Sequence, residues 1–306
     1  SGIDHTKPLT AGPLTLGFDY FFGCSASWDM PPYAWIENDS LIDSDLVPTK
    51  KKANGFGRAG LKSKKMKPES ALPDLTAKAI SYIKNTKTEN KDKPFFLYFP
   101  LPSPHTPVAP NKDFIGKSQA GKYGDFVFET DWVVGEVMKT IDDAGITANT
   151  LLIATSDNGP ETTWKKRAEI FSHQSNAIFK EGKRSIYEGG HRVPFFIRWP
   201  GKIKPGSKLN AAICQTDLLA TLAEMLGKTL PNNAGEDSNS FYAQMINSGD
   251  AKSHPAIIHH SSQGRFAIRE GKWKLVMPGT KKSMKAQLYD MEKDPRETTD
   301  LAGRHT

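Results

Sequence analysis

An apolar run that ends in a carboxylate, a carboxamide and a glycine is the feature that most limits how this chain folds. Residues 151–156 read Leu-Leu-Ile-Ala-Thr-Ser, and Asp157, Asn158 and Gly159 follow directly. A short apolar run indicates a strand buried on both faces, and ligands gather at the carboxyl ends of strands in parallel α/β sheets. The side-chain oxygens of Asp157 and Asn158 are suitable ligands for calcium or magnesium. An isolated Ser-Asp-Asn-Gly sequence more often forms only an Asx turn.

Two further segments place polar residues beside apolar runs. Residues 95–99 (Phe-Phe-Leu-Tyr-Phe) predict a strand, and His105 follows among prolines. Lys183 lies in the run Gly-Lys-Arg-Ser-Ile-Tyr-Glu-Gly-Gly-His-Arg-Val-Pro, which leads into a strand-like Phe-Phe-Ile-Arg. We therefore expect three strand ends to present His105, Asp157 with Asn158, and Lys183, in that order along the chain.

These motifs, in this order, resemble the sulfatase family, in particular its arylsulfatase A-like branch in the alkaline-phosphatase superfamily. The resemblance runs from Gly-Phe-Asp-Tyr-Phe-Phe-Gly at residues 17–23 to Leu-Tyr-Asp at 288–290. It implies an α/β fold, an alkaline-phosphatase-like mixed sheet flanked by helices, with a small carboxyl-terminal antiparallel-sheet subdomain. We expect residues 1–250 to form the later part of the catalytic domain and residues 251–306 to form a carboxyl-terminal α+β subdomain.

The motif for the family's nucleophile does not occur in this sequence. Sulfatases of this type carry a Cys-x-Pro-x-Arg motif whose cysteine or serine becomes formylglycine, and neither Cys24 nor Cys214 has those neighbours. Asp142-Asp143-Ala-Gly imitates the family's paired-Asp metal site, but it ends a helical pattern, with Gly145 as the cap. We therefore expect formylglycine and the remaining calcium ligands to belong to an amino-terminal part that this chain lacks.

A second imitation occurs near the carboxyl terminus. Gly-Lys-Trp-Lys-Leu at residues 271–275 resembles the family's sulfate-contact segment Gly-Lys-Trp-His-Leu-Gly, but Lys274 replaces the histidine. We interpret this segment as a strand of the end subdomain.

The resemblance assigns roles to residues that match its motifs. Lys183 would contact the sulfate and could protonate the departing oxygen, and His105 would act as the base that releases sulfate from the nucleophile. Asp157 and Asn158 would complete a Ca²⁺ site. His173 and His260 are candidate substrate contacts.

The expected partner is a sulfated small molecule or glycan. The chain carries a net charge of +7, much of it between residues 50 and 67, which we interpret as a basic surface loop. Because aromatic residues hardly interleave with these lysines, nucleic-acid binding is not expected. No apolar run reaches transmembrane length. The family resemblance favours an extracytoplasmic location, whether periplasmic, secreted or lysosomal.

Periodicity places helices and strands along the chain. Helical spacing covers residues 72–83, 123–141 and 215–226, and short strands are expected at 256–259, 265–269 and 273–277. Helices and strands therefore alternate as in a layered α/β sheet. The aromatic group of Trp28, Tyr33 and Trp35 and the separate Trp164 could stack on a sugar, but packing in the core is the commoner fate of such residues.

The sequence supports a sulfuric ester hydrolase acting on a sulfated glycan or aryl sulfate. Three alternatives stay open: a phosphoryl or phosphonate ester hydrolase of the same superfamily, a catalytically silent module that binds sulfated glycans, and a partial chain with no role of its own. A chain without the early strands would expose strand edges and apolar surface, so we expect aggregation or association with another chain that supplies the missing part.

Overall fold

The structure is a computed structural model, and it describes residues 7–51, 57–89, 93–246, 254–279 and 285–304. The chain divides into two compact units, Ser1–Ile146 and Thr147–Thr306. The boundary expected near residue 250 is a different division. It falls at residues 247–253, outside the described residues, and stays a prediction.

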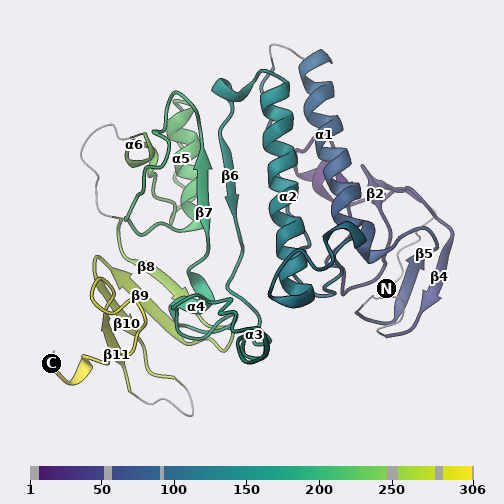
Figure 1. The fold of residues 1–306 in the computed structure, drawn as a ribbon. Helices are drawn as coiled ribbons and strands as arrows, with labels where there is room; N and C mark the ends of the chain where they lie inside the picture. Colours follow the sequence, from purple (N-terminus) through teal and green to yellow (C-terminus); the bar gives the residue numbers. More distant parts are fainter. Residues whose placement is uncertain (1–6, 52–56, 90–92, 247–253, 280–284, 305–306) are drawn as a thin grey trace. The chain divides into compact units, whose positions relative to one another are not determined.

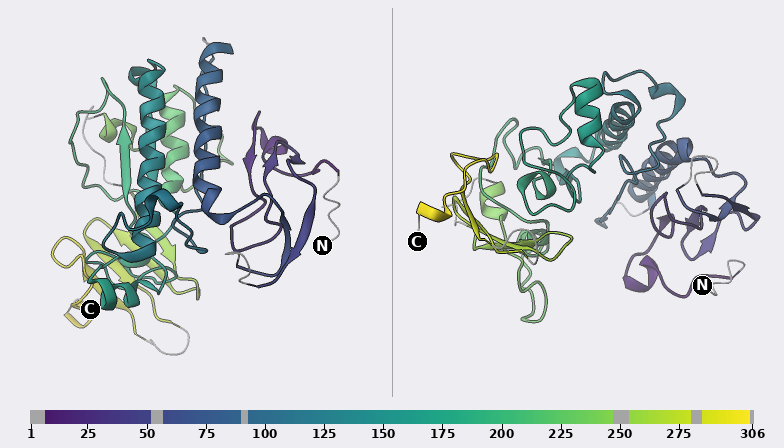
Figure 2. Two further views of the ribbon diagram at one scale, coloured as in Figure 1. Left: turned by 45° about the vertical axis from the view of Figure 1, so that its right-hand side comes forward. Right: turned by 90° about the horizontal axis from the view of Figure 1, so that it is seen from below.

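Two helices form the framework of the first unit. Helix α1 spans Ala71–Glu89 and α2 spans Gly121–Asp143, which confirms both helices expected from the periodicity. They lie side by side in every view (Figures 1 and 2). Leu72 of α1 and Phe126 and Val133 of α2 are buried in one cluster, since both helices turn their apolar faces toward each other.

Helix α2 ends at a glycine cap, as the sequence predicts. Gly145 has a φ of 67°, and its N–H donates to the carbonyl of Asp142. The N–H of Ile146 donates to the carbonyl of Ile141, which completes a Schellman motif. Asp142 and Asp143 therefore belong to a helix terminus, and the likeness to a paired-Asp metal site is superficial.

Short strands make up the rest of the first unit. Strands β1 Phe22–Gly23, β2 Ile36–Glu37 and β3 Ser40–Leu41 form one antiparallel sheet in that order, and β4 Leu46–Thr49 pairs with β5 Gly60–Ser63. The prediction that residues 50–67 form a surface loop is wrong for 60–63, because these residues pair with β4 along its whole length. The described part of this unit also has three 3₁₀ turns: Pro13–Leu16 before β1, Pro68–Ser70 before α1 and Lys112–Phe114 before α2.

Three of the aromatic residues singled out in the sequence belong to the core. Trp28 is 4% exposed and Tyr33 is 2% exposed, and Trp35 packs against the cluster that they form. The Tyr33 hydroxyl accepts from the N–H of Arg58 and donates to its carbonyl. These side chains are therefore fixed inside the first unit, and stacking on a substrate is not their role.

The strand predicted at residues 95–99 does not form within the described residues. The segment is extended and its side chains alternate, with Phe96 and Tyr98 each 67% exposed and the intervening residues half-buried. Period-two alternation sets where side chains point, but a strand also needs a neighbour for its N–H and C=O groups. No described segment supplies that neighbour here.

The second unit begins with two paired strands. Strand β6, Leu152–Thr155, pairs with β7, Phe195–Arg198, in antiparallel register from Leu152 opposite Arg198 to Thr155 opposite Phe195. The expectation of a strand buried on both faces in a parallel arrangement is therefore wrong for the described residues: Leu152, Ile153 and Ala154 are half-buried.

Short helices lie between the two strands and after them. They are α3 Trp164–Phe171, α4 Glu188–His191, α5 Leu218–Met225 and α6 Tyr242–Met245, with 3₁₀ turns at Thr147–Asn149, Gln215–Asp217 and Ala302–Arg304. The helix expected at 215–226 is confirmed as a 3₁₀ turn running into α5. Phe241 lies against Phe195 of β7, and its N–H donates to Thr221 of α5, so the three segments pack together.

A four-stranded antiparallel sheet closes the second unit (Figure 1). Its strands are β8 Ile257–His260, β9 Phe266–Glu270, β10 Trp273–Val276 and β11 Gln287–Asp290, in the order β11-β10-β9-β8. The three strands expected after residue 255 are confirmed. One core cluster joins this sheet to the segment before α4; its members are Ile186, Tyr187, Ala267, Val276, Tyr289 and Met291.

A substitution pair on α2 tests the packing of the first unit. Phe126 is 3% exposed and Phe128 is 50% exposed, on the same helix. We expect Phe126→Ala to lower the free energy of unfolding by about 3–5 kcal/mol, because it leaves a cavity. Phe128→Ala is the control and should cost about 1 kcal/mol or less. Urea denaturation followed by circular dichroism measures both, and equal losses would contradict this packing.

Candidate functional site

Asp157 and Asn158 lie just past the end of β6, as the sequence predicts. Asp157 is exposed and Asn158 is half-buried. Within the part of the chain that the structure describes, neither side chain makes a hydrogen bond or an ion pair, so both oxygens are available to a ligand. The turn itself is held by backbone contacts, which leaves these side chains free of a structural task.

Backbone hydrogen bonds clamp this turn to the segment that carries Lys183. The N–H of Lys183 donates to the carbonyl of Pro160 at 2.8 Å, and the N–H of Gly159 donates to the carbonyl of Gly190 at 3.1 Å. A Cβ on Gly159 would lie 1.8 Å from the carbonyl oxygen of Gly189, so only glycine permits this approach. The clamp brings the Asp157–Asn158 turn and Lys183 into one site.

Lys183 does not lie at a strand end, contrary to the expectation from the sequence. It occupies a turn ahead of α4, since the segment before β7 folds back over the end of β6. Its side chain is half-buried and, among the described residues, makes no ion pair. Gly182 packs its backbone against the indole of Trp164, which therefore supports the turn.

An ion pair joins the same two segments next to Lys183. The guanidinium of Arg184 donates to both carboxylate oxygens of Glu161, at 2.7 and 2.6 Å. Partial burial raises the pKa of Glu161, but hydrogen bonds from Arg184 and Thr162 outweigh it and lower that pKa to about 2. The carbonyl of Arg184 accepts from the N–H of Ser262, in the turn between β8 and β9. The turn therefore contacts both the loop after β6 and the end sheet.

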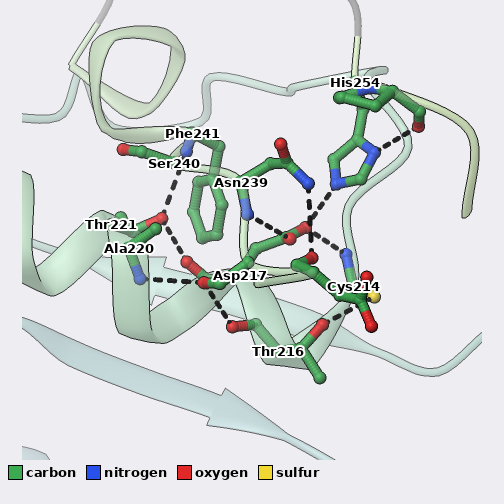
Figure 3. A network of polar contacts seen from close by, with 12 residues as sticks. Cys214, Thr216, Asp217, Ala220, Thr221, Asn239, Ser240, Phe241 and His254 are labelled. Carbon is green, nitrogen blue, oxygen red and sulfur yellow. Dashed lines mark hydrogen bonds and ion pairs between the residues drawn. The ribbon is translucent and has the colours of Figure 1, made fainter. Parts of the chain in front are cut away.

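A buried aspartate organises the side of β6 near α5 (Figure 3). Asp217 is fully buried and accepts hydrogen bonds from the N–H groups of Cys214 and Asn239 and from the imidazole of His254 at 2.9 Å. The Gln215 side chain donates to the carbonyl of Ser156, next to Asp157. The Asp217 network therefore anchors Ser156, the residue that precedes the Asp157–Asn158 turn.

His105 belongs to the first unit, and the other candidate site residues belong to the second. Its side chain is exposed, and Nδ1 lies 2.7 Å from the carbonyl oxygen of Thr106. A carbonyl only accepts, so Nδ1 carries the proton and the lone pair lies on Nε2. Burial raises the pKa of Asp29, but the hydrogen bond from Ser27 and the positive charge that His105 carries in its protonated form, with that of Arg58, lower it below its usual value.

The two candidate substrate contacts differ in their surroundings. His173 is exposed in the loop after α3 and, within the described residues, makes no contact. His260 ends β8, where it is exposed; its Nδ1 lies 2.9 Å from the carbonyl of Ser261 and its ring contacts Phe266. Both stay predictions as substrate contacts.

Sequence reasoning missed a buried ionic group behind the Lys183 turn. Lys274 of β10 is fully buried between Glu188 and Glu297. The rings of His259 and His191 meet edge-on nearby, with their centroids 4.4 Å apart. Burial and the charge of Lys274 lower the pKa of both, and His191 adds to the effect on His259, whose pKa falls to about 4. A lysine on the same strand face as Val276 is the one signal that could have revealed this group.

The donor set at the turn fits part of a calcium site. Asp157 and Asn158 offer hard oxygens with no competing partner among the described residues, but calcium takes roughly six to eight ligands. No group of three acidic, histidine or cysteine side chains suitable for a metal occurs within the described residues. The two side chains therefore suit a shared calcium site and do not form one alone.

Comparison with known proteins now decides the family. A profile described as Sulfatase matches residues 4–228, and one described as N-sulphoglucosamine sulphohydrolase, C-terminal, matches residues 178–306. The chain belongs to the sulfatase family. It is 32% identical to an N-acetylgalactosamine-6-O-sulfatase of Bacteroides thetaiotaomicron, over 99% of this chain and 68% of that protein. It is 31% identical to human arylsulfatase A, over 95% of this chain and 61% of that protein.

A solved structure supports the same conclusion. A sulfatase-family protein from a glycosaminoglycan-metabolism locus of B. thetaiotaomicron superposes with a TM-score of 0.86 and 30% identity, over 99% of this chain and 72% of that one. The family and the fold class inferred from the sequence are confirmed. The chain spans 68% of the length of the first of these two curated relatives and 61% of the second. None of the described helices is both long and apolar enough to cross a membrane.

The Glu161–Arg184 pair predicts a specific acid sensitivity. The folded-state pKa of Glu161 is lowered to about 2, so the pair's stabilisation is present above the ordinary value of 4.5 and is lost as the pH falls from 4.5 toward 2. Because the pair is partly exposed, it contributes about 1 kcal/mol or less. Unfolding titrations of wild type and Glu161→Gln should converge across that range. Glu169→Gln, on exposed α3, is the control and should show no such convergence.

The Asp217 network predicts that a nearly isosteric substitution at Asp217 lowers the stability of the protein. Asp217→Asn replaces an acceptor by an amide that cannot accept from both N–H groups and His254, and should lower the free energy of unfolding by about 1–3 kcal/mol. Asp237→Asn, exposed in the following loop, should change it by less than about 0.5 kcal/mol. Thermal unfolding of both variants measures this. An Asp217→Asn protein as stable as wild type would show that the network carries no stability.

Proposed function

We propose that the natural protein containing this chain is a sulfuric ester hydrolase that acts on a sulfated glycan. The observation that supports this most is the clamp that holds a half-buried Lys183, without an ion-pair partner among the described residues, to the Asp157–Asn158 turn. The Lys183 ammonium and a cation held by Asp157 and Asn158 would both bind an anion, and a sulfate ester is such an anion. Family membership supports the same reaction class.

Lys183 carries the chemistry that this unit can supply. Its ammonium offers three N–H donors to the sulfate oxygens, which stabilises negative charge that develops as the ester bond breaks. The same group can deliver a proton to the departing alkoxide. Asp157 and Asn158 would hold a calcium ion, which would neutralise charge on the sulfate group.

His105 supplies a base in this proposal. Its Nδ1–H is engaged by the Thr106 carbonyl, which leaves Nε2 free to take a proton from the nucleophile after sulfate transfer. Neither cysteine of this sequence has the neighbours of a formylglycine motif. We therefore assign the nucleophile, a formylglycine, to residues outside these 306.

The relatives support a proposal for the substrate and the location. One is named an N-acetylgalactosamine-6-O-sulfatase and another structure comes from a glycosaminoglycan-metabolism locus, so a 6-O-sulfated amino sugar of a glycan is the substrate we propose. His173 and His260, both exposed, would contact its ring or neighbouring units. Membership of the sulfatase family favours an extracytoplasmic location for the natural protein.

A substitution series on the natural protein tests the proposal. With calcium present, turnover of 4-nitrophenyl sulfate and of N-acetylgalactosamine-6-sulfate should fall about 100-fold or more in Lys183→Ala, because one positioned donor of this kind supplies that much. Asp157→Ala should lose activity that excess calcium partly restores. Lys202→Ala, an exposed lysine of the same unit, is the control and should match wild type.

Three other outcomes would overturn the proposal. Hydrolysis of phosphate or phosphonate esters in preference to sulfates would assign the chain to a different reaction class. Tight binding of sulfated glycan without turnover would make it a binding module. Full activity in Lys183→Ala would remove the residue on which the mechanism depends.

A further inference from the structure

We propose that Lys274 is a positioning residue: paired with Glu188 and Glu297, it fixes the turn that presents Lys183 to substrate. The inference rests on the proposed function, because it gives Lys183 the role of sulfate contact. It assigns the end sheet a part in catalysis beyond that of covering the core.

Lys274 is held between two carboxylates in a dry environment. Its side chain is fully buried, and Nζ lies 2.9 Å from a carboxylate oxygen of Glu188 and 2.8 Å from one of Glu297. Glu297 is likewise fully buried. An ammonium taken out of water is tolerated only where opposite charges surround it, so the three groups hold one arrangement in the folded unit.

Glu297 accepts hydrogen bonds from both ends of the segment that contains Lys183, at Glu188 and at Lys180. Its carboxylate accepts from the N–H of Glu188 at 2.6 Å, and its carbonyl accepts from the ammonium of Lys180 at 3.2 Å. The N–H of Gly189 donates to the carbonyl of Lys180 at 2.9 Å and closes the loop. Lys183 therefore sits within a loop whose two ends are tied to one buried glutamate.

The backbone of this loop is tightly packed, so a shift at one point moves the rest of the loop. A Cβ on Gly189 would lie 2.2 Å from the carbonyl of Glu181, so the strands of the loop touch through backbone. Since Gly159 and Pro160 bond to the far side of the same loop, a shift at Glu188 is passed to Lys183 and to the Asp157–Asn158 turn together. Misplacement of a reacting group by about 1 Å can cost about 100-fold in rate.

A purely stabilising role is the weaker interpretation. Buried ion pairs often contribute little net stability compared with apolar residues of similar size, because desolvation offsets their attraction. The Lys274 group has two carboxylates for one ammonium: burial raises the pKa of Glu297, while Lys274 overcomes burial and lowers the pKa of Glu188. Unlike apolar contacts, these directional ion pairs and hydrogen bonds fix the position of the Glu188 backbone relative to β10.

The test uses the natural protein with Lys274→Met and Glu188→Gln. Lys272→Met is the matched control, since Lys272 lies two residues away, is 43% exposed, and its ammonium lies 4.0 Å from Asp290 and over the ring of Trp273. Two quantities are measured: kcat and KM for 4-nitrophenyl sulfate per folded molecule, and hydrogen exchange of the amides of Lys183, Ser185, Gly189 and Gly190 against those of β9 and β10. Circular dichroism at low temperature supplies the folded fraction.

We expect Lys274→Met to lower kcat per folded molecule by about 10- to 100-fold, with a smaller change in KM. The loop amides should exchange about tenfold faster while the strand amides keep their protection. Glu188→Gln, which keeps the shape and the backbone bond, should change both in the same direction and tests the proposal if Lys274→Met does not fold. The control should match wild type in both.

Two results would overturn the inference: an unchanged kcat per folded molecule in Lys274→Met and Glu188→Gln, or exchange that rises equally in the loop and in the sheet. Absence of sulfatase activity in the wild type contradicts the proposed function instead. In that case the exchange pattern alone decides whether Lys274 positions the loop.

Discussion

The site depends on the close approach of two backbones, the turn after β6 and the loop before β7. Gly159 reaches the Gly189–Gly190 backbone so closely that any side chain there would collide with a carbonyl oxygen, and the N–H of Lys183 closes the contact on Pro160. Because backbone groups make this clamp, the side chains of Asp157, Asn158 and Lys183 need not hold the structure together. They are left available for a metal and an anion, which is the chemistry that a sulfatase requires.

Two ionic groups support the clamp from different sides. Arg184 and Glu161 join the same segments at the surface, where water limits the strength of their attraction. Lys274, Glu188 and Glu297 join the loop to the end sheet from within, where the charges cannot part without leaving a buried ion unpaired. The buried aspartate Asp217 holds the strand end through Gln215 and Ser156. Stability of the second unit and the geometry of its site therefore share the same residues.

Local patterns in the sequence predicted α1, α2, α5, three strands of the end sheet and the Gly145 cap, because apolar periodicity and a left-handed glycine act over a few residues. The motif resemblance predicted the family. Long-range geometry was beyond these patterns. Residues 95–99 alternate like a strand yet pair with no described segment, and Lys183 lies in a fold-back turn where a strand end was expected. Sequence patterns linked Lys274 only to a family motif. They did not predict its burial, because that depends on Glu188 and Glu297, which lie far away in the sequence.

A crystal structure of the natural protein with calcium and inorganic sulfate tests the central claim most directly. The account predicts a calcium ion on the side-chain oxygens of Asp157 and Asn158, and a sulfate within hydrogen-bond distance of Lys183 Nζ, with the Gly159–Gly190 and Lys183–Pro160 bonds intact. Calcium bound elsewhere, or a sulfate held away from Lys183, would show that the clamp is only structural and that the reaction takes place at another site.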